Sequence, residues 1–155
     1  MQNLRQKKPP KEQHDDKSQE KALRNKTILL AEDNKLNAEI AMTILQDAHA
    51  RVEVASDGAI ALSMLKEAPA GYYDVILMDI QMPHMNGYQA SEAIRKLLDD
   101  RARTPIIAMT ANAFEEDHKA ALEAGMDAYV AKPIEIDTPF STITQVLNKD
   151  SLDLK

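Results

Sequence analysis

The chain contains no cysteine, few aromatic residues and no long hydrophobic run. Because there is no thiol, disulfide bonds and thiolate metal sites are excluded. Aromatic residues make up only 4% of the sequence, so aliphatic side chains and the eight methionines must fill any core. No apolar stretch approaches the roughly 20 residues that a membrane-spanning helix needs. The N-terminal sequence MQNLRQKKPPKEQ lacks the apolar segment of a signal peptide, so we expect a cytoplasmic location, although a longer parent protein could be membrane-anchored.

The charge of the chain is unevenly distributed. Residues 1–26 hold eight Lys or Arg and four Asp or Glu, a net charge of +4, whereas residues 27–155 hold 11 and 21, a net charge of −10. The acidic body argues against direct binding of nucleic acid. Residues 1–26 are almost free of large apolar side chains, so we interpret them as a disordered linker, or at best a frayed helix from Asp16 to Arg24. Residues 27–147 are expected to form one domain, followed by a frayed tail at 148–155.

Short apolar runs alternate with amphipathic patterns through the predicted domain, which indicates an α/β fold. The runs predict buried parallel strands at 27–31, 51–55, a segment ending at Asp79, a segment beginning at Pro105, and 128–131. The patterns between them predict helices at 35–48, from Ser56 or Asp57 onward, after Gly87, at 114–124, and from Thr138 onward. Five such units, with both faces of the sheet covered, imply a flavodoxin-like doubly wound parallel sheet with strand order 2-1-3-4-5.

The spacing of apolar residues predicts which face of each helix is buried. In the first helix, the predicted core face carries Leu36, Ile40, Ile44 and Leu45, and in the second it carries Ile60, Met64 and Leu65. Leu36 has a second interpretation as an exposed anchor for a partner protein. The helix at 114–124 has a weak apolar face composed mostly of alanine, so we expect it to be less stable and able to move.

Polar residues stand at the ends of four of the predicted strands. Glu32 and Asp33 follow the first strand, Asp79 ends the third, Thr110 ends the fourth, and Lys132 follows the fifth. The carboxyl ends of parallel strands lie at one rim of the sheet, where open α/β folds keep their ligand site. Clustered carboxylates repel one another unless a cation such as Mg²⁺ joins them. A hydroxyl and an ammonium beside the metal suit a phosphoryl group.

Four ordered motifs at these strand ends carry a family resemblance. They read AEDN at 31–34, MDIQMPHMNG at 78–87, AMTANA at 108–113 and AKPI at 131–134. Together they resemble the receiver domain of two-component response regulators, from about Thr27 to Leu147. The runs 31–37 and 109–113 are most similar to receivers fused to hybrid histidine kinases.

The resemblance implies a role for each strand-end residue. Asp79 would be the nucleophile that accepts a phosphoryl group. Asp33 and Asp79 would bind Mg²⁺ directly, the backbone carbonyl of Gln81 would add a ligand, and Glu32 would act mainly through water. Without the resemblance, each carboxylate has an ordinary interpretation as a helix cap or a turn residue.

Two further side chains complete the implied phosphoryl site, and one responds to it. Lys132 would bind the phosphoryl oxygens, and Thr110 would donate a hydrogen bond to one of them. Tyr129 would pack inward when Thr110 moves toward the phosphate. The simpler alternatives are a surface lysine, a threonine that favours strands, and a half-buried tyrosine on an edge strand.

Gln81 and Asn112 each lie two residues beyond a predicted site residue. These offsets predict that both side chains stand at the mouth of the site, where an attacking water must line up. Since both are neutral amides, they can orient or obstruct water but cannot act as strong bases. We therefore expect them to tune the lifetime of the phosphorylated form.

The leading functional hypothesis is a receiver that takes a phosphoryl group from phosphohistidine onto Asp79. Its expected partners are a histidine kinase, a histidine phosphotransfer protein, or both. We expect no independent enzyme activity beyond self-phosphorylation, and the parent of a hybrid-kinase fragment would be a histidine kinase. The alternatives are a free-standing single-domain regulator, a degenerate receiver that only docks, and a haloacid-dehalogenase-like phosphohydrolase. The last of these places a second carboxylate two residues after its nucleophile, where this chain has Gln81.

Overall fold

The computed structural model describes residues 23–110, 115–131, 142–143 and 145–147. Its centre is a five-stranded parallel sheet with the order β2-β1-β3-β4-β5, as predicted. The strands are β1 (Thr27–Ala31), β2 (Arg51–Ala55), β3 (Val75–Asp79), β4 (Ile106–Thr110) and β5 (Ala128–Ala131). Every residue of β1, β3 and β4 is buried, because helices cover both faces of the sheet.

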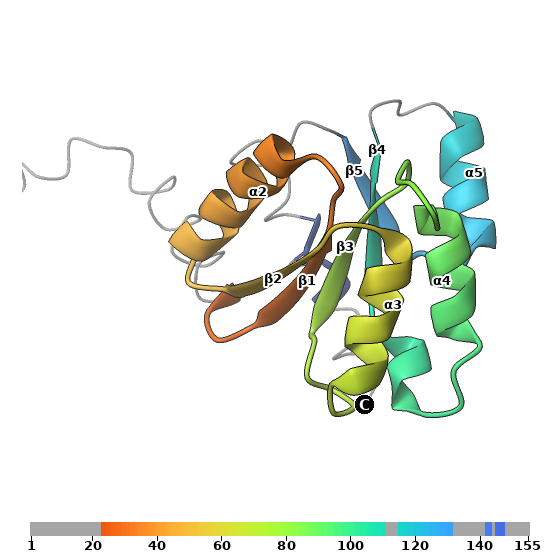
Figure 1. Ribbon diagram of the computed structural model, residues 1–155, viewed down its shortest axis with the longest axis horizontal. Helices are drawn as coiled ribbons and strands as arrows, with labels where there is room; N and C mark the ends of the chain where they lie inside the picture. Colours follow the sequence, from red (N-terminus) through yellow and green to blue (C-terminus); the bar gives the residue numbers. More distant parts are fainter. Residues whose placement is uncertain (1–22, 111–114, 132–141, 144, 148–155) are drawn as a thin grey trace, which may run out of the picture.

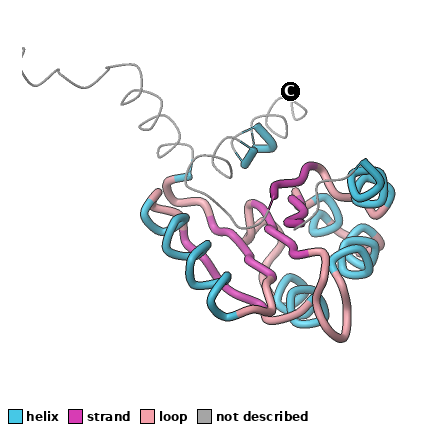
Figure 2. Tube along the Cα trace, turned by 90° about the horizontal axis from the view of Figure 1, so that it is seen from above, coloured by secondary structure: helices cyan, strands magenta, loops and turns pink. Residues whose placement is uncertain are grey.

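The helices are α2 (Lys35–Asp47), α3 (Gly58–Glu67), α4 (Gly87–Arg95), the short 3₁₀ helix η2 (Asp100–Arg103) and α5 (Glu115–Glu123). Helix α2 lies on one face of the sheet, whereas α3, α4 and α5 lie on the other (Figures 1 and 2). Strand four begins at Ile106 rather than at the predicted Pro105. Proline has no N–H for the ladder, so Pro105 contributes only its carbonyl, which accepts from the Ile76 amide at 2.8 Å.

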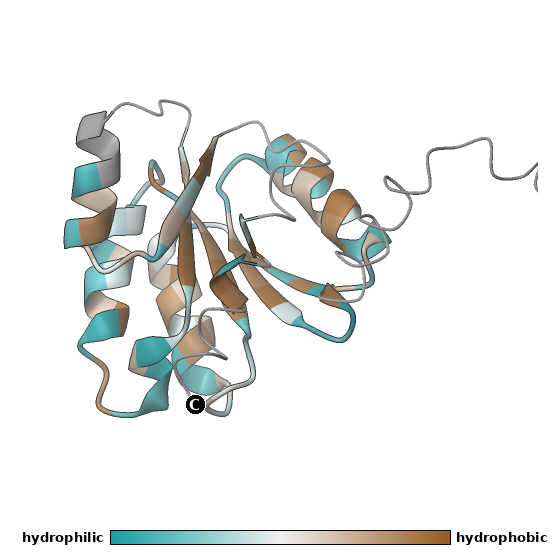
Figure 3. Ribbon diagram, turned by 180° about the vertical axis from the view of Figure 1, so that it is seen from behind, coloured by the Kyte–Doolittle hydropathy of each residue, from teal (hydrophilic) through white to brown (hydrophobic). Residues whose placement is uncertain are grey.

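Two apolar clusters hold the sheet between its helical layers. Ile28 and Leu30 belong to the cluster beneath α2, which also contains Ile143 and Val146. Leu29 belongs to the opposite cluster, beneath α3, α4 and α5. Successive side chains of a strand point to opposite faces, so a continuous apolar run supplies both clusters. Figure 3 shows this arrangement as apolar strands between helices with mixed outer surfaces.

The helices α2, α3 and α4 each begin at a residue whose side chain accepts a hydrogen bond from the first turn. Asn34 caps α2, Asp57 caps α3, and Asn86 caps α4 within a complete capping box. These side chains satisfy backbone N–H groups that have no partner inside the helix. Of the two residues predicted to start the second helix, Ser56 and Asp57, it is Asp57 that caps it. Gly125 follows α5 with a φ of +95°, the left-handed conformation that commonly ends a helix and that glycine adopts most readily.

The predicted core faces of α2 and α3 are partly wrong. Ile40 is 42% exposed and Ile60 is 41% exposed, while Leu36 is 65% exposed. The buried positions are instead small residues together with one leucine in each helix: Ala38, Ala41 and Leu45 in α2, and Gly58, Ala61 and Leu65 in α3. Small side chains allow the helix backbone to approach the sheet, and the larger branched residues are left at the margin.

Leu23 lies in the segment that we predicted as a linker, yet it is fully buried in the cluster beneath α2. The Lys26 amide donates to the Leu23 carbonyl at 3.0 Å, and the Lys26 carbonyl accepts from Arg51 at the start of β2. The core therefore begins four residues before Thr27. At the other end, Ile143 is buried and Leu147 is partly buried, whereas Thr138, the predicted start of the last helix, lies outside the described residues.

A pair of tyrosines stabilises the outer strand β2 through one carboxylate. Glu53 accepts hydrogen bonds from the Tyr72 hydroxyl at 2.5 Å and the Tyr73 hydroxyl at 2.6 Å. These bonds, that of Tyr72 foremost, lower the pKa of Glu53 below its ordinary value. The two rings meet edge to face, with centroids 4.8 Å apart.

Candidate functional site

Three carboxylates gather at the carboxyl end of the sheet. Ala31 pairs with Met78 across the β1–β3 ladder, so the residues that follow them emerge side by side. One carboxylate oxygen from each of Glu32, Asp33 and Asp79 lies within 4.8 Å of the others. Glu32 and Asp79 are buried, whereas Asp33 is exposed. The strand-end positions thus bring together all three predicted carboxylates in a group able to hold a cation.

Backbone amides fix the orientation of the two buried carboxylates. The Asn34 amide donates to Oε2 of Glu32 at 3.1 Å, and the Gln81 amide donates to Oδ1 of Asp79 at 3.2 Å. Amide donors stabilise the ionised form of a carboxylate. They leave further oxygen lone pairs to coordinate a hard cation, which takes oxygen ligands. The donor set therefore fits Mg²⁺.

Thr110 lies at the buried end of β4, next to the strand that carries Asp79. Asp79 pairs with Met109 in the β3–β4 ladder, which places Thr110 one position beyond Asp79 along the rim. Thr110 also pairs with Ala131 in β5. The predicted phosphoryl-binding residue Lys132 comes directly after Ala131, but it lies outside the described residues, as does Asn112.

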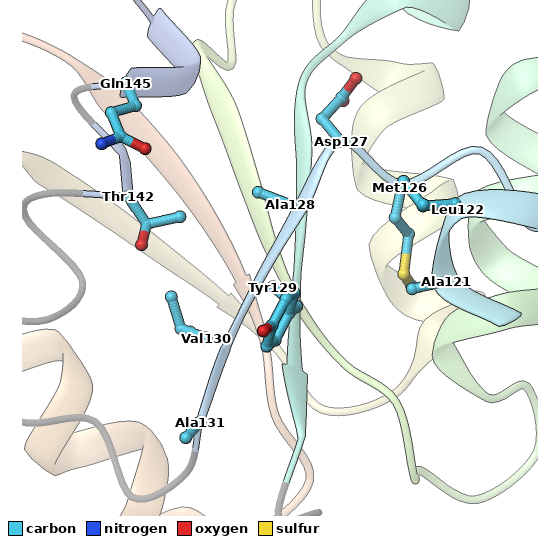
Figure 4. Close-up of a pocket in the computed structure, with 10 residues that line it drawn as sticks. All are labelled: Ala121, Leu122, Met126, Asp127, Ala128, Tyr129, Val130, Ala131, Thr142 and Gln145. Carbon is cyan, nitrogen blue, oxygen red and sulfur yellow. The ribbon is translucent and has the colours of Figure 1, made fainter. Parts of the chain in front are cut away.

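Tyr129 is 39% exposed on the outer strand β5. Its register partner is Ala108, two residues before Thr110 on β4, so Tyr129 and Thr110 belong to the same face of the sheet. Tyr129 lines a mainly apolar cavity of about 550 Å³ together with Leu122 and Met126. Figure 4 shows Tyr129 and Val130 on opposite sides of β5.

The loop between Asp79 and α4 is tightly packed against the site. The Gly87 amide donates to the Ile80 carbonyl at 2.8 Å. A Cβ at position 87 would lie 2.5 Å from the Asp79 carbonyl oxygen, closer than van der Waals contact permits. Glycine is needed here because the chain returns against its own backbone. Gln81 is exposed and lines a cavity of about 510 Å³ with Asp33 and Tyr88, beside the carboxylates.

The structure adds one pair that the sequence analysis missed. Nδ1 of His84 lies 3.0 Å from Oδ2 of Asp57, so the loop after Asp79 is tied to the start of α3. Asp57 was predicted only as a possible start of this helix, and His84 only as part of the motif at 78–87. The two residues are 27 positions apart, and no motif connects them, so only the fold reveals the contact.

Comparison with known proteins assigns the chain to a family. A family model of the response regulator receiver domain matches residues 28–144. The chain belongs to this family. The match covers the sheet and the carboxylate cluster of this receiver domain, and it agrees with the motif resemblance.

The curated relatives include much longer kinases. Hybrid signal transduction histidine kinase M from Dictyostelium discoideum is 40% identical over 126 residues, which are 79% of this chain but only 5% of that protein. Sensor histidine kinase GacS from Pseudomonas protegens is 39% identical over 109 residues, 69% of this chain and 12% of that protein. This receiver is therefore related to the receivers of hybrid histidine kinases.

A solved structure shows what a related site can hold. The receiver domain of sensor histidine kinase PA1611 from Pseudomonas aeruginosa, with a magnesium ion coordinated in its active site cleft, is 35% identical. The TM-score is 0.67, and the match covers 81% of this chain and 96% of that one. Within the described part of this receiver, no helix is both long and apolar enough to span a bilayer.

Proposed function

We propose that the protein is a phosphoacceptor receiver of a two-component phosphorelay, with Asp79 as the acceptor. The observation that carries this proposal is the buried Asp79 at the end of β3, with oxygens of Glu32 and Asp33 within 4.8 Å. Membership of the receiver family supports the same role. A carboxylate at a strand end beside a cation site is suited to nucleophilic attack on phosphorus.

In the proposed step, a carboxylate oxygen of Asp79 attacks the phosphorus of a phosphohistidine. A carbon–oxygen–phosphorus linkage forms and the phosphorus–nitrogen bond breaks. The electron pair of that bond stays on the imidazole nitrogen, which takes a proton from solvent. The product is an acyl phosphate on Asp79, and hydrolysis later returns the free carboxylate and inorganic phosphate.

The cofactor that we propose is Mg²⁺. Asp33, Asp79 and the Gln81 carbonyl would hold it directly, and Glu32 would act through water. When bound, the ion offsets the negative charge of the carboxylates and of the phosphoryl group. The exposed position of Asp33 gives the site an open side, consistent with the waters that Mg²⁺ usually retains.

The remaining proposed roles belong to residues around the acceptor. Thr110 would donate a hydrogen bond to a phosphoryl oxygen, and Lys132 would pair with the phosphoryl charge. Tyr129 would follow Thr110, a role supported by their placement on the same face of adjacent strands. Gln81 and Asn112 would tune the rate of hydrolysis by orienting or obstructing water. Decay rates of the phosphorylated Gln81→Ala and Asn112→Ala proteins equal to that of the parent would remove this last role.

The proposed partner is a histidine kinase or a histidine phosphotransfer protein. The receiver domain of Ssk1 from Saccharomyces cerevisiae was crystallised with the histidine phosphotransfer protein Ypd1. The matched chain of that complex is 26% identical to this one, with a TM-score of 0.74, and the match covers 83% of this chain and 92% of that one. Leu36 and Ile40 are exposed in the first turns of α2, next to the rim that carries Asp79. These side chains provide apolar area for a docked helix. A receiver within a hybrid histidine kinase is the setting that we favour, with a free-standing regulator as the alternative.

The test of the proposed function is incubation with acetyl phosphate and Mg²⁺, followed by peptide mass spectrometry. We expect one added phosphate on Asp79, and none in Asp79→Asn, because the nearly isosteric amide is a far poorer nucleophile. Asp99→Asn, the same substitution at the exposed cap of η2, is the matched control and should retain phosphorylation. Phosphate that persists on the Asp79→Asn protein would exclude Asp79 as the acceptor.

A further inference from the structure

His84 has an unusual backbone conformation in the loop that follows Asp79. Its φ is +68°, in the left-handed region that residues other than glycine rarely adopt. Such a conformation is unfavourable for an L-residue and persists where surrounding contacts hold it. The contact here is the 3.0 Å approach of its Nδ1 to Oδ2 of Asp57.

Asp57 uses both carboxylate oxygens. Oδ1 accepts a hydrogen bond from the Ile60 amide at 2.8 Å, which caps α3, while Oδ2 faces His84. The Ile60 amide chiefly, and then His84, hold the pKa of Asp57 below its ordinary value, against the opposing effect of burial. The side chain of Asp57 is only 10% exposed, whereas that of His84 is 76% exposed. The buried carboxylate of Asp57 thus contacts the exposed imidazole of His84 through one ring nitrogen, Nδ1.

The backbone beside this pair is in direct contact across the same junction. The Gly58 amide donates to the Met85 carbonyl at 3.1 Å. A Cβ at position 58 would lie 2.4 Å from that carbonyl oxygen, so any other residue would push the loop away. The first residue of α3 and the loop therefore pack backbone to backbone, next to the pair formed by Asp57 and His84.

The same loop is attached to the site at its other end. The Gln81 amide donates to Oδ1 of Asp79, and Gly87 closes the loop onto Ile80. Residues 80–87 therefore form a short closed loop with two supports, the acceptor carboxylate on one side and α3 on the other. Gln81 lies in the chain between the two supports.

We propose that Asp57 and His84 form a clamp that positions the loop at 80–87 for metal binding. They are positioning residues: neither belongs to the carboxylate cluster, and they act by holding the backbone of Gln81 in place. This inference rests on the proposed function, because it assigns the control of the same Mg²⁺ site. The contact joins a single pair of side chains, so the main effect of the clamp is on the geometry of the loop.

The test uses two variants that break the clamp and keep the helix cap. Asp57→Ser retains a good capping side chain but is too short to reach His84. His84→Gly removes the imidazole and also relieves the left-handed backbone. His84→Asn tolerates that backbone conformation and places an amide near the position of Nδ1, so it should restore part of the effect. Asp99→Ser is the matched control, since Asp99 caps η2 and pairs with Arg101 away from the site.

The first measurement is hydrogen exchange in the metal-free protein. We expect faster exchange of the Gly58 amide, which crosses the junction, and of the Gln81 amide, which contacts Asp79, in Asp57→Ser and His84→Gly. The Asp99→Ser control should match the parent at both amides. If the Gln81 amide exchanges at the parental rate in both clamp variants, the proposal is overturned, whatever the Mg²⁺ titration shows.

The second measurement is a Mg²⁺ titration followed by NMR. Loss of groups that orient metal ligands weakens binding by about 10- to 100-fold, and we expect the clamp variants to reach the lower end, about 10-fold. The double variant Asp57→Ser, His84→Gly should bind Mg²⁺ no more weakly than either single variant, because both substitutions remove the same interaction. Parental Mg²⁺ affinity in both single variants overturns the clamp. Absence of Mg²⁺ binding by the parent would instead refute the proposed function, and the exchange at Gln81 would still decide whether the clamp positions the loop.

Discussion

Replacing Asp79 with asparagine should stabilise the metal-free protein. Asp79 and Glu32 are both buried, and oxygens of the two carboxylates lie within 4.8 Å of each other. Two unit charges 4.8 Å apart repel by about 3.5 kcal/mol at an effective dielectric constant of about 20. The amide removes one charge while its oxygen can still accept from Gln81, although that neutral hydrogen bond is weaker by roughly 1 kcal/mol. The expected net gain is about 1–3 kcal/mol.

Urea unfolding at neutral pH with a chelator present measures this gain as a higher midpoint at unchanged slope. Addition of Mg²⁺ should then raise the midpoint of the parent, because a ligand that binds only the folded state stabilises it. The Asp79→Asn protein should respond much less, since it has lost a ligand. Asp99→Asn controls for the loss of an aspartate elsewhere on the chain.

Three results would refute this reasoning. A metal-free Asp79→Asn protein equal to or less stable than the parent would mean that repulsion within the cluster is already relieved. Equal stabilisation of parent and variant by Mg²⁺ would mean that the ion binds elsewhere. If the gain in stability disappears in high salt, the relieved repulsion was between solvent-exposed charges and not between the buried Asp79 and Glu32. Salt screens buried pairs only weakly.

Three further outcomes are expected. Leu23→Ala should lower the free energy of unfolding by about 2–5 kcal/mol, as for other buried leucines, and a midpoint equal to that of the parent would contradict its place in the core. Gly87→Ala should destabilise the fold and lower the rate of phosphorylation by acetyl phosphate, because the new methyl group meets the Asp79 carbonyl oxygen at 2.5 Å; parental values for both would argue against the close approach. Glu53→Gln should destabilise the protein near neutral pH but not in acid, because a carboxylate with a lowered pKa contributes stability above its unfolded-state pKa and loses it as the pH falls through the folded-state pKa. Urea midpoints across the acidic range would test this, and a difference between parent and variant that persists in strong acid would rule it out.

The sheet and the carboxylate cluster were predictable from the sequence for physical reasons. Strands buried on both faces require continuous apolar runs, and these runs located β1, β3 and β4. Parallel strands end at a common rim, so the positions of Asp33 and Asp79 at the ends of two such runs were enough to predict that they meet.

The helix faces were less predictable. Alanine is compatible with both core and surface, so the pattern alone favoured Ile40 and Ile60 for positions that Ala41 and Ala61 occupy. Leu23 was missed because a single apolar residue in a polar segment has no periodicity to mark it. The contact of Asp57 with His84 depends on how α3 and the loop meet in space, which local spacing does not encode.

The burial of Leu23 also fixes the chain ahead of the first strand. Leu23 precedes the first residue of β1, whereas the carboxylates lie at the carboxyl ends of the parallel strands β1 and β3. A strand rises about 3.3 Å per residue, so the five residues of β1 separate the two ends of the sheet by about 17 Å. Leu23 therefore secures the chain at the end of the sheet away from the rim where a phosphoryl donor would have to dock.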